Sequence, residues 1–293
     1  MNTIQSIAII GATGMLGSSV TKILKHQGYS VTAVVRDMPK AQRKLGAETY
    51  VLKGDLQDKA SLRTAFADVD FVYLSLHTKP DEKNNDFKTE IHGIQNVIEA
   101  AKSARVKRIG HLSSLVKDYN ENNWWMFDIK NEACRILKEA EIPVTIFYPS
   151  NFYENLTNQQ LKGNRVMLAG DQLTKSWWIG TKDYGMQVAN AFRLDRDHNE
   201  DREYSIQGLE PFNMEEAADE FIKHHPNQKL KKSKAPLGAL KLMKPLSATI
   251  DYQYNIINAI NHYDEKFQSE KTWEKLGKPE QTLAQWAAEQ SDN

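Results

Sequence analysis

The sequence predicts an α/β fold: a doubly wound parallel sheet with a smaller C-terminal lobe on its substrate side. Three observations lead to this prediction. Short apolar segments alternate with amphipathic helical segments up to residue 150. A turn with glycines at positions 11, 14 and 17 separates the first apolar segment from the first helical one. Beyond Pro149 the alternation becomes irregular. Short apolar strands joined by amphipathic helices are typical of a parallel sheet that is covered on both faces.

The strands expected in the first half are short and rich in apolar, often β-branched residues. They comprise residues 6–10, 30–35, 48–52, 70–76, 107–113 and 143–148. Each helix between them shows one apolar face. The expected helices are one that follows the glycine turn and ends at Gly28, one capped by Asp58, a long one from Phe87 to Ala101, and one over about 126–140.

Residues 1–150 are therefore expected to form one domain, and residues 151–293 a smaller substrate-side lobe. Strands are expected in this lobe at 166–168 and 203–207, helices at 183–194, 213–224 and 282–288, and an apolar-rich segment spans 242–267. No Gly/Ser-rich linker joins the two parts, so we expect the lobe to pack on the first domain.

Charge and cysteine content narrow the possible partners. The 293 residues include 38 Lys and Arg and 38 Asp and Glu, so no net charge attracts nucleic acid or an anionic membrane. A lysine-rich stretch from Lys229 to Lys244 lacks interleaved aromatic residues and is interpreted as a solvated loop. No apolar run reaches the ~18 residues of a membrane-spanning helix. The single cysteine, Cys134, excludes an internal disulfide and fits a reducing cytosol, so we expect a cytoplasmic protein.

The glycine turn carries the most specific chemical signal. It follows a strand and opens a helix, which is the setting in which a dinucleotide cofactor binds a Rossmann fold. Gly11 permits the tight turn, Gly14 lets backbone N–H groups approach a pyrophosphate, and Gly17 allows close packing of the helix. The helix N-terminus adds free donors and partial positive charge. The sequence therefore predicts NAD(P) binding here.

The motifs of this chain resemble those of the NmrA-like group of atypical short-chain dehydrogenase/reductases. The Gly-Ala-Thr-Gly turn at 11–14 is similar to the start of that group, and Tyr148-Pro149-Ser150-Asn151-Phe152 is similar to its Arg-Pro-x-x-Phe segment, with tyrosine in place of arginine. The resemblance spans nearly the whole chain. With the positions at strand ends, it implies cofactor contacts by Gly11, Thr13, Gly14, Met15, Leu16, Gly17, Arg36, Lys40, Asp55, Leu56, Leu76, His77, Lys130, Tyr148, Pro149, Asn151 and Phe152.

The choice between the two dinucleotides depends on Arg36. NAD enzymes usually carry an acid near this point, which binds the ribose hydroxyls. A guanidinium can instead bind a 2′-phosphate through charge-assisted hydrogen bonds and stack on adenine, and Lys40 adds positive charge. Asp37 keeps NAD possible. The sequence favours NADP.

The catalytic apparatus of the standard enzymes is incomplete. None of the eleven tyrosines has a lysine four residues later, and Met126 stands where the tyrosine would precede Lys130. Lys130 is expected to hold the nicotinamide ribose or to donate a proton, and Ser113 to lie near the nicotinamide. The alternatives are a solvated helix lysine and an ordinary serine at a strand end.

Two classes of function remain. One is an NADPH-dependent reductase of a small quinone-like or aromatic acceptor, with Phe152, Tyr153, Trp177 and Trp178 lining an apolar pocket or belonging to the core. The other is a non-catalytic NADP sensor that binds a protein partner, which the resemblance also implies. A nucleotide-sugar epimerase-like enzyme is a third possibility, against which the missing tyrosine counts. A homodimer is compatible with each of these.

Overall fold

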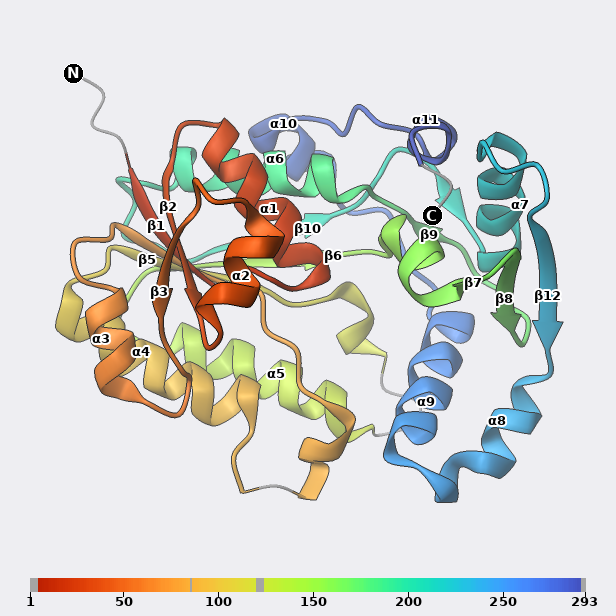
Figure 1. Cartoon of the computed structure of the whole chain (residues 1–293), viewed down its shortest axis with the longest axis horizontal. Helices are drawn as coiled ribbons and strands as arrows, with labels where there is room; N and C mark the ends of the chain where they lie inside the picture. Colours follow the sequence, from red (N-terminus) through yellow and green to blue (C-terminus); the bar gives the residue numbers. More distant parts are fainter. Residues whose placement is uncertain (1–4, 85, 120–123, 291–293) are drawn as a thin grey trace.

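The central layer of the molecule is a seven-stranded sheet in the order β10-β6-β5-β4-β1-β2-β3, with every pairing parallel. The computed structural model (Figure 1) describes residues 5–84, 86–119 and 124–290. The strands are β1 (Ser6–Ile10), β2 (Ser30–Val35), β3 (Tyr50–Lys53), β4 (Phe71–Leu74), β5 (Arg108–Leu112), β6 (Val144–Pro149) and β10 (Arg202–Ile206). The expected parallel α/β sheet is confirmed.

Helices cover both faces of this sheet, as a doubly wound fold requires. One face packs against α1 (Met15–His26), α2 (Met38–Leu45) and α6 (Thr181–Leu194). The other packs against α3 (Lys59–Ala65), α4 (Ile94–Ala104) and α5 (Trp125–Lys138). Each face forms its own continuous apolar core. Asp58 caps α3 as expected, because its carboxylate accepts from the N–H groups of Ala60 and Ser61.

The main sheet and its covering helices continue beyond residue 150. Both α6 and β10 follow that boundary, yet α6 packs along α1 and β10 pairs with β6. β10 extends the sheet beyond β6, and α6 covers one of its faces. The main sheet and its helices therefore include part of the chain that was expected in the second lobe. The strand expected at 203–207 corresponds to β10, Arg202–Ile206, at the edge of the main sheet.

Apart from α10, which lies beside α6, the remaining C-terminal elements gather at one end of the molecule, away from β1, β2 and β3 (Figure 1). They include a three-stranded sheet of β7 (Leu161–Lys162), β8 (Arg165–Ala169) and β12 (Lys231–Ala235), and a pair formed by β9 (Ser176–Trp177) and β11 (Pro211–Phe212). The helices are α7 (Met214–His224), α8 (Leu237–Met243), α9 (Ala248–His262), α10 (Glu270–Leu276) and α11 (Leu283–Ala288). Of these, α10 packs on α6. No helix in the described ranges has the length and apolar character needed to cross a bilayer.

The segment between β4 and α4 differs most from expectation. The helix predicted from Phe87 begins with a π-helical turn, Thr89–Gly93, and becomes α-helical only at Ile94. It is preceded by a 3₁₀ turn, Pro80–Asn84, on which α9 packs. This packing brings the C-terminal lobe against the carboxyl end of β4, where a doubly wound fold binds its ligand.

Candidate functional site

The glycine turn has a backbone that only glycine fits at two positions. Gly11 has φ +82°, and a Cβ there would lie 2.1 Å from the carbonyl oxygen of Ser75. A Cβ on Gly17 would lie 2.1 Å from the carbonyl oxygen of Gly11. Gly14 is the N-cap of α1, and no side chain caps that helix. The first turn of α1, with Met15 and Leu16, therefore leaves N–H groups for an anion.

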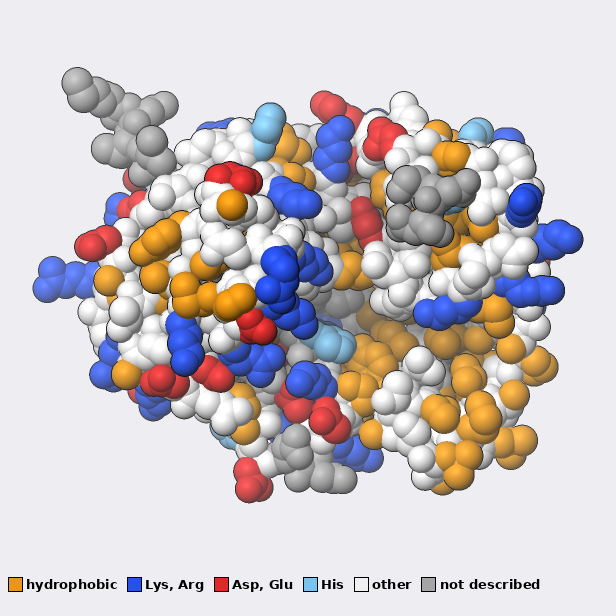
Figure 2. Space-filling model, viewed as in Figure 1, with side chains coloured by type: hydrophobic (Ala, Val, Ile, Leu, Met, Phe, Trp, Pro, Cys, Tyr) orange, Lys and Arg blue, Asp and Glu red, His pale blue; other side chains and the backbone are white. Residues whose placement is uncertain are grey.

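A cavity of about 720 Å³ opens beside this turn, at the carboxyl ends of β1, β2 and β4. Its walls contain many of the residues predicted from the sequence: Gly11, Thr13, Arg36, Lys40, Asp55, Leu56, Leu76 and His77. Figure 2 shows Lys and Arg side chains on one side of a central hollow, with hydrophobic side chains over α8 and α9 on the other. The volume and the adjoining helix N-terminus suit a dinucleotide.

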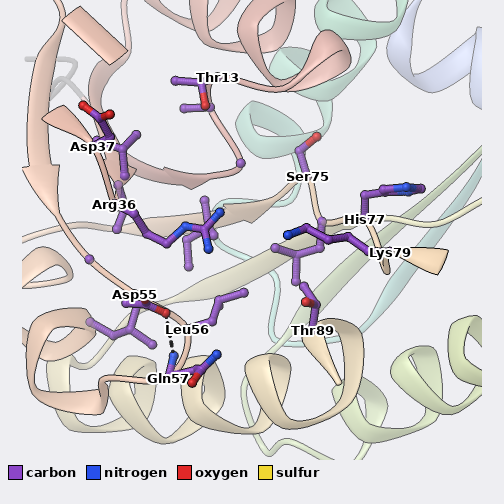
Figure 3. Close-up of a pocket in the computed structure, with 18 of the residues that line it drawn as sticks. Thr13, Arg36, Asp37, Asp55, Leu56, Gln57, Ser75, His77, Lys79 and Thr89 are labelled. Atoms are coloured by element: carbon purple, nitrogen blue, oxygen red, sulfur yellow. Dashed lines mark hydrogen bonds between the residues drawn. The ribbon is translucent and has the colours of Figure 1, made fainter. Parts of the chain in front are cut away.

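Three cations reach the walls of this cavity: Arg36, Lys40 and Lys79. In the described part of the chain, no carboxylate lies within ion-pair distance of any of them. Figure 3 shows Arg36 and Lys79 extending into the cavity from opposite walls. Cations left without an internal partner around a concave site are suited to bind phosphates.

Asp37 has a structural use that bears on the choice of cofactor. Its carboxylate accepts a hydrogen bond of 2.9 Å from the backbone N–H of Lys40 and so caps α2. An acid employed in this way is less free to bind ribose hydroxyls, while the neighbouring Arg36 points into the cavity (Figure 3). The geometry therefore favours the reading based on Arg36.

Lys130 lies beyond the cavity, next to its wall residue His77. Its ammonium Nζ lies 3.2 Å from Oε1 and 3.1 Å from Oε2 of Glu90, a carboxylate with no exposed surface. Burial lowers the pKa of His77, and the nearby positive charge of Lys130 lowers it further. The ring of Tyr252, on α9, meets the His77 ring edge-on at 5.9 Å. Lys130, His77 and Tyr252 thus form the far end of the site.

A second histidine lies beneath this cluster. His111, on β5, has no exposed surface, and neither of its ring nitrogens has a hydrogen-bond partner among the described residues. Burial is the main cause that lowers the pKa of His111 to about 4, and the charge of Lys130 acts in the same direction while Glu90 opposes it. The imidazole is therefore neutral near pH 7.

The residues one turn before and one turn after Lys130 on α5 are buried. Met126, one turn before it, is 2% exposed and replaces the usual tyrosine with an apolar side chain. Cys134, one turn after it, donates through Sγ to the hydroxyl of Ser113 at 3.5 Å. Ser113 is itself buried and does not line the cavity. Of these residues, Lys130 has the most exposed side chain.

The segment that ends β6 does not line the cavity. Tyr148 donates its hydroxyl to Glu203 at 2.7 Å, Pro149 pairs with Ile206, and the carbonyl of Asn151 accepts from the N–H of Ile179. Phe152, Tyr153 and Trp178 are buried in the core, and Trp177 packs on Phe267 with ring centroids 4.6 Å apart. Of the two alternatives left open for these four residues, Phe152, Tyr153 and Trp178 take the core position, and Trp177 is half-buried outside the cavity.

Several residues near the site were not predicted from the sequence. They are Ser75, Lys79, Glu82, Thr89 and Gln57 on the cavity wall, and Glu90 and Tyr252 at its far end. One sequence signal was available for Glu90, because an acid heads the apolar face that continues through Ile94, Ile98 and Ala101. Tyr252 gave no such signal, since only the folding of α9 brings it to His77.

Comparisons with known proteins agree with this architecture. The model of the NmrA-like family matches residues 3–275. The chain is 28% identical over 261 residues to the photosystem II assembly factor Ycf39 of Guillardia theta, covering 86% of this chain and 80% of that protein. The structure is similar to that of an NADPH-dependent quinone oxidoreductase from Escherichia coli, with a TM-score of 0.71, 25% identity, and coverage of 96% and 98% of the two chains. It also shares the fold of a Citrobacter triphenylmethane reductase complexed with NADP(H), with a TM-score of 0.74, 19% identity, and coverage of 97% and 99%.

Proposed function

The chain belongs to the NmrA-like family, and from this premise we propose that it is an NADPH-dependent reductase of a small quinone-like or aromatic acceptor. The observation that carries the proposal is the continuity of one site. A cavity beside the glycine turn, with three cations that have no carboxylate partner among the described residues, leads through His77 to Lys130 and Tyr252. The likeness to a quinone oxidoreductase over almost the full length of both chains supports it.

The residues of the cavity have distinct roles in this proposal. The first turn of α1 donates to the diphosphate, and Arg36 and Lys40 bind the 2′-phosphate. When bound, the cofactor supplies the hydride, which is the hard part of the chemistry. The fit rests on the glycine backbone that a side chain would obstruct and on the free cations around the cavity.

The acceptor would lie between Lys130 and the aromatic side chains of α9. Two-electron reduction of a quinone takes up one hydride and one proton, and negative charge develops on the acceptor oxygen. The Lys130 ammonium is the group at this end suited to stabilise that charge or to donate the proton. Tyr252, which is half-buried and packs on Trp124 with ring centroids 5.2 Å apart, offers an apolar side chain to an aromatic ring.

A second candidate is an NADP-responsive regulator or assembly protein without turnover. Two observations favour it: Met126 replaces the catalytic tyrosine, and relatives such as the Guillardia theta protein are named photosystem II assembly factors. In this case the cofactor site would be the same, and the far end would have no acceptor to reduce.

Consumption of NADPH with a panel of benzoquinones and naphthoquinones separates the two candidates. The reductase oxidises NADPH with at least one quinone, and Lys130→Met lowers that turnover at saturating NADPH by roughly 10²–10⁴, the usual range for an acid–base group. Lys138→Met, an exposed lysine of the same helix, is the matched control and should retain full turnover. NADPH binding in calorimetry without oxidation by any acceptor would establish the regulator instead.

A further inference from the structure

Glu90 is held between two elements that belong to different parts of the site. Its Oε1 accepts from the backbone N–H of Thr78 at 2.9 Å and from the Thr78 hydroxyl at 3.1 Å. Both of its carboxylate oxygens face the Lys130 ammonium. Thr78 directly follows the cavity residue His77, whereas Lys130 lies on α5. The carboxylate therefore links the cavity wall to the lysine.

From this geometry we infer that Glu90 is a positioning residue, which fixes the Lys130 ammonium at the acceptor end of the cavity and so acts on the reaction through that lysine. The inference rests on the proposed reductase function for its kinetic consequence. It also makes a statement about Lys130 that is independent of turnover.

The burial of Glu90 argues that its charge has a specific use. Desolvation of a fully buried carboxylate opposes ionisation, yet the Lys130 charge, His111 and the Thr78 N–H together lower the pKa of Glu90 below its ordinary value. A buried ion pair adds little net stability compared with apolar residues of similar volume. Its clearer physical effect is to fix the geometry of the groups that it joins.

The surroundings leave Lys130 few other partners. On α5, the residues one turn before and after it are Met126 and Cys134, neither of which carries a charge. His111 beneath it is neutral near pH 7 because its pKa is lowered to about 4. Among the described residues, Glu90 is the only carboxylate within 4.0 Å of the Lys130 ammonium. Without it, the flexible four-carbon lysine side chain loses its anchor.

The backbone conformation around Glu90 also supports this role. The residue lies in the π-helical turn Thr89–Gly93, at the start of the buried face of the following helix. Single π-helical turns are frequent at functional sites. On its other side, Glu82 accepts from the N–H groups of Lys79 and Thr89, at 3.2 and 2.7 Å, and closes the loop between them. Glu90 is therefore held by contacts with both backbone and side-chain groups.

The test uses Glu90→Gln, which keeps the volume and the acceptor for Thr78 but removes the charge that faces Lys130. Turnover with NADPH and the best quinone should fall by roughly 10–10² at saturation, as expected when a reacting group is misplaced by about an ångström. The Michaelis constant for NADPH should change less than about threefold, because the phosphate contacts remain. In a Lys130→Met background, Glu90→Gln should change turnover no further.

A second readout does not need turnover. Lys130 is acetylated with a trace of acetic anhydride, and its modification is measured by mass spectrometry. Loss of a charge-assisted hydrogen bond to the ammonium should raise the labelling rate of Lys130 roughly tenfold or more in Glu90→Gln. Asp195→Asn is the matched control: this carboxylate is equally buried, accepts from Thr145 and Tyr204, and lies away from the site. Lys130 labelling should stay at the parent value in that variant.

The two readouts separate failure of the inference from failure of the proposed function. If no quinone is reduced but Glu90→Gln raises Lys130 labelling and the control does not, the reductase proposal fails and the positioning of Lys130 stands. If Lys130 labelling is unchanged in a folded Glu90→Gln variant, or if its loss of turnover persists equally in the Lys130→Met background, Glu90 does not position the lysine.

Discussion

Arg36 and Lys40 face the cavity without a carboxylate partner in the described part of the chain, whereas Lys130 is already paired with a fully buried glutamate. Both ends of the site are positively charged, but only the first is left for a ligand to neutralise. The first end gains most when phosphates arrive. The second already has its buried partner, as preorganised charged groups do. Changes at the first end should therefore act on affinity, and changes at the second on turnover or on stability.

Gly14→Val should have the largest effect on the binding end. The branched side chain would project from the N-cap of α1 into the space of the diphosphate. Several charge-assisted hydrogen bonds of roughly 1.5–3 kcal/mol each would be lost, and NADPH affinity should fall by about 10² or more. The fold should survive, because a Cβ here meets only the Gly11 carbonyl oxygen at 3.2 Å. Titration of protein fluorescence with NADPH measures this.

Gly238→Val is the matched control for that variant. Gly238 has an ordinary φ, and no atom lies within 4 Å of its ideal Cβ position. It should bind NADPH like the parent protein. Equal NADPH affinity in the parent and in Gly14→Val would remove the glycine turn from the cofactor site.

Arg36→Ala should change the preference between the two cofactors. A guanidinium that binds the 2′-phosphate contributes only to NADPH, so the ratio of NADPH to NADH affinity should fall roughly tenfold or more. Arg43→Ala, an exposed arginine of α2 that does not line the cavity, should leave the ratio nearly unchanged. A ratio that is the same in both variants would mean that Arg36 does not contact the phosphate.

His111 offers the contrasting test at the buried end. Its pKa is lowered to about 4 in the folded chain, while an unfolded histidine titrates near pH 6.5. Between these values the unfolded state binds the extra proton, so the free energy of unfolding must fall as the pH drops from 6.5 towards 4. This group alone should cost roughly 2 kcal/mol between pH 7 and pH 5.

His111→Leu should remove that part of the pH dependence and leave NADPH affinity at pH 7 almost unaltered. Urea denaturation of parent and variant at pH 7 and pH 5 measures the difference. If the two proteins lose the same stability between these pH values, His111 does not titrate as its burial implies.

The same contrast explains what the sequence could and could not predict. The glycine turn, Arg36 and Lys40 lie within 30 residues of each other, and their spacing along strand, turn and helix carries the information. The far end combines His77, Glu90, Lys130 and Tyr252 from four separate elements. No local pattern records their contacts, since these depend on the π-helical turn and on the packing of α9.

The aromatic residues that follow β6 show a related limit of the sequence. Phe152 and Trp178 are bulky apolar residues next to a strand end, and from the sequence alone such residues suit a pocket or a core equally. Phe152 packs against Tyr184 of α6 with ring centroids 5.3 Å apart, whereas Trp178 belongs to the core of the C-terminal lobe with Phe221 and Trp286. The packing of α6 on the main sheet was not predicted, because the chain beyond residue 150 was assigned to the second lobe.

Lys79 should give the smallest effect and the finest distinction. It reaches the cavity from the wall opposite Arg36 (Figure 3), next to His77, so we expect it to approach the diphosphate, which NADPH and NADH share. Lys79→Gln removes one point charge from a hydrated cavity, and the affinities for both cofactors should fall by a similar factor, about three- to tenfold. Lys83→Gln, an exposed lysine of the same loop that does not line the cavity, should change neither affinity.

The distinction from Arg36→Ala lies in the ratio of the two affinities: Lys79→Gln should lower both affinities and keep their ratio. A selective loss of NADPH affinity would instead place the Lys79 ammonium on the 2′-phosphate, so that this phosphate would be held from both walls of the cavity. Unchanged affinity for both cofactors would show that a cation can face this cavity without contributing to binding, and would weaken the inference drawn from unpaired charge at the binding end.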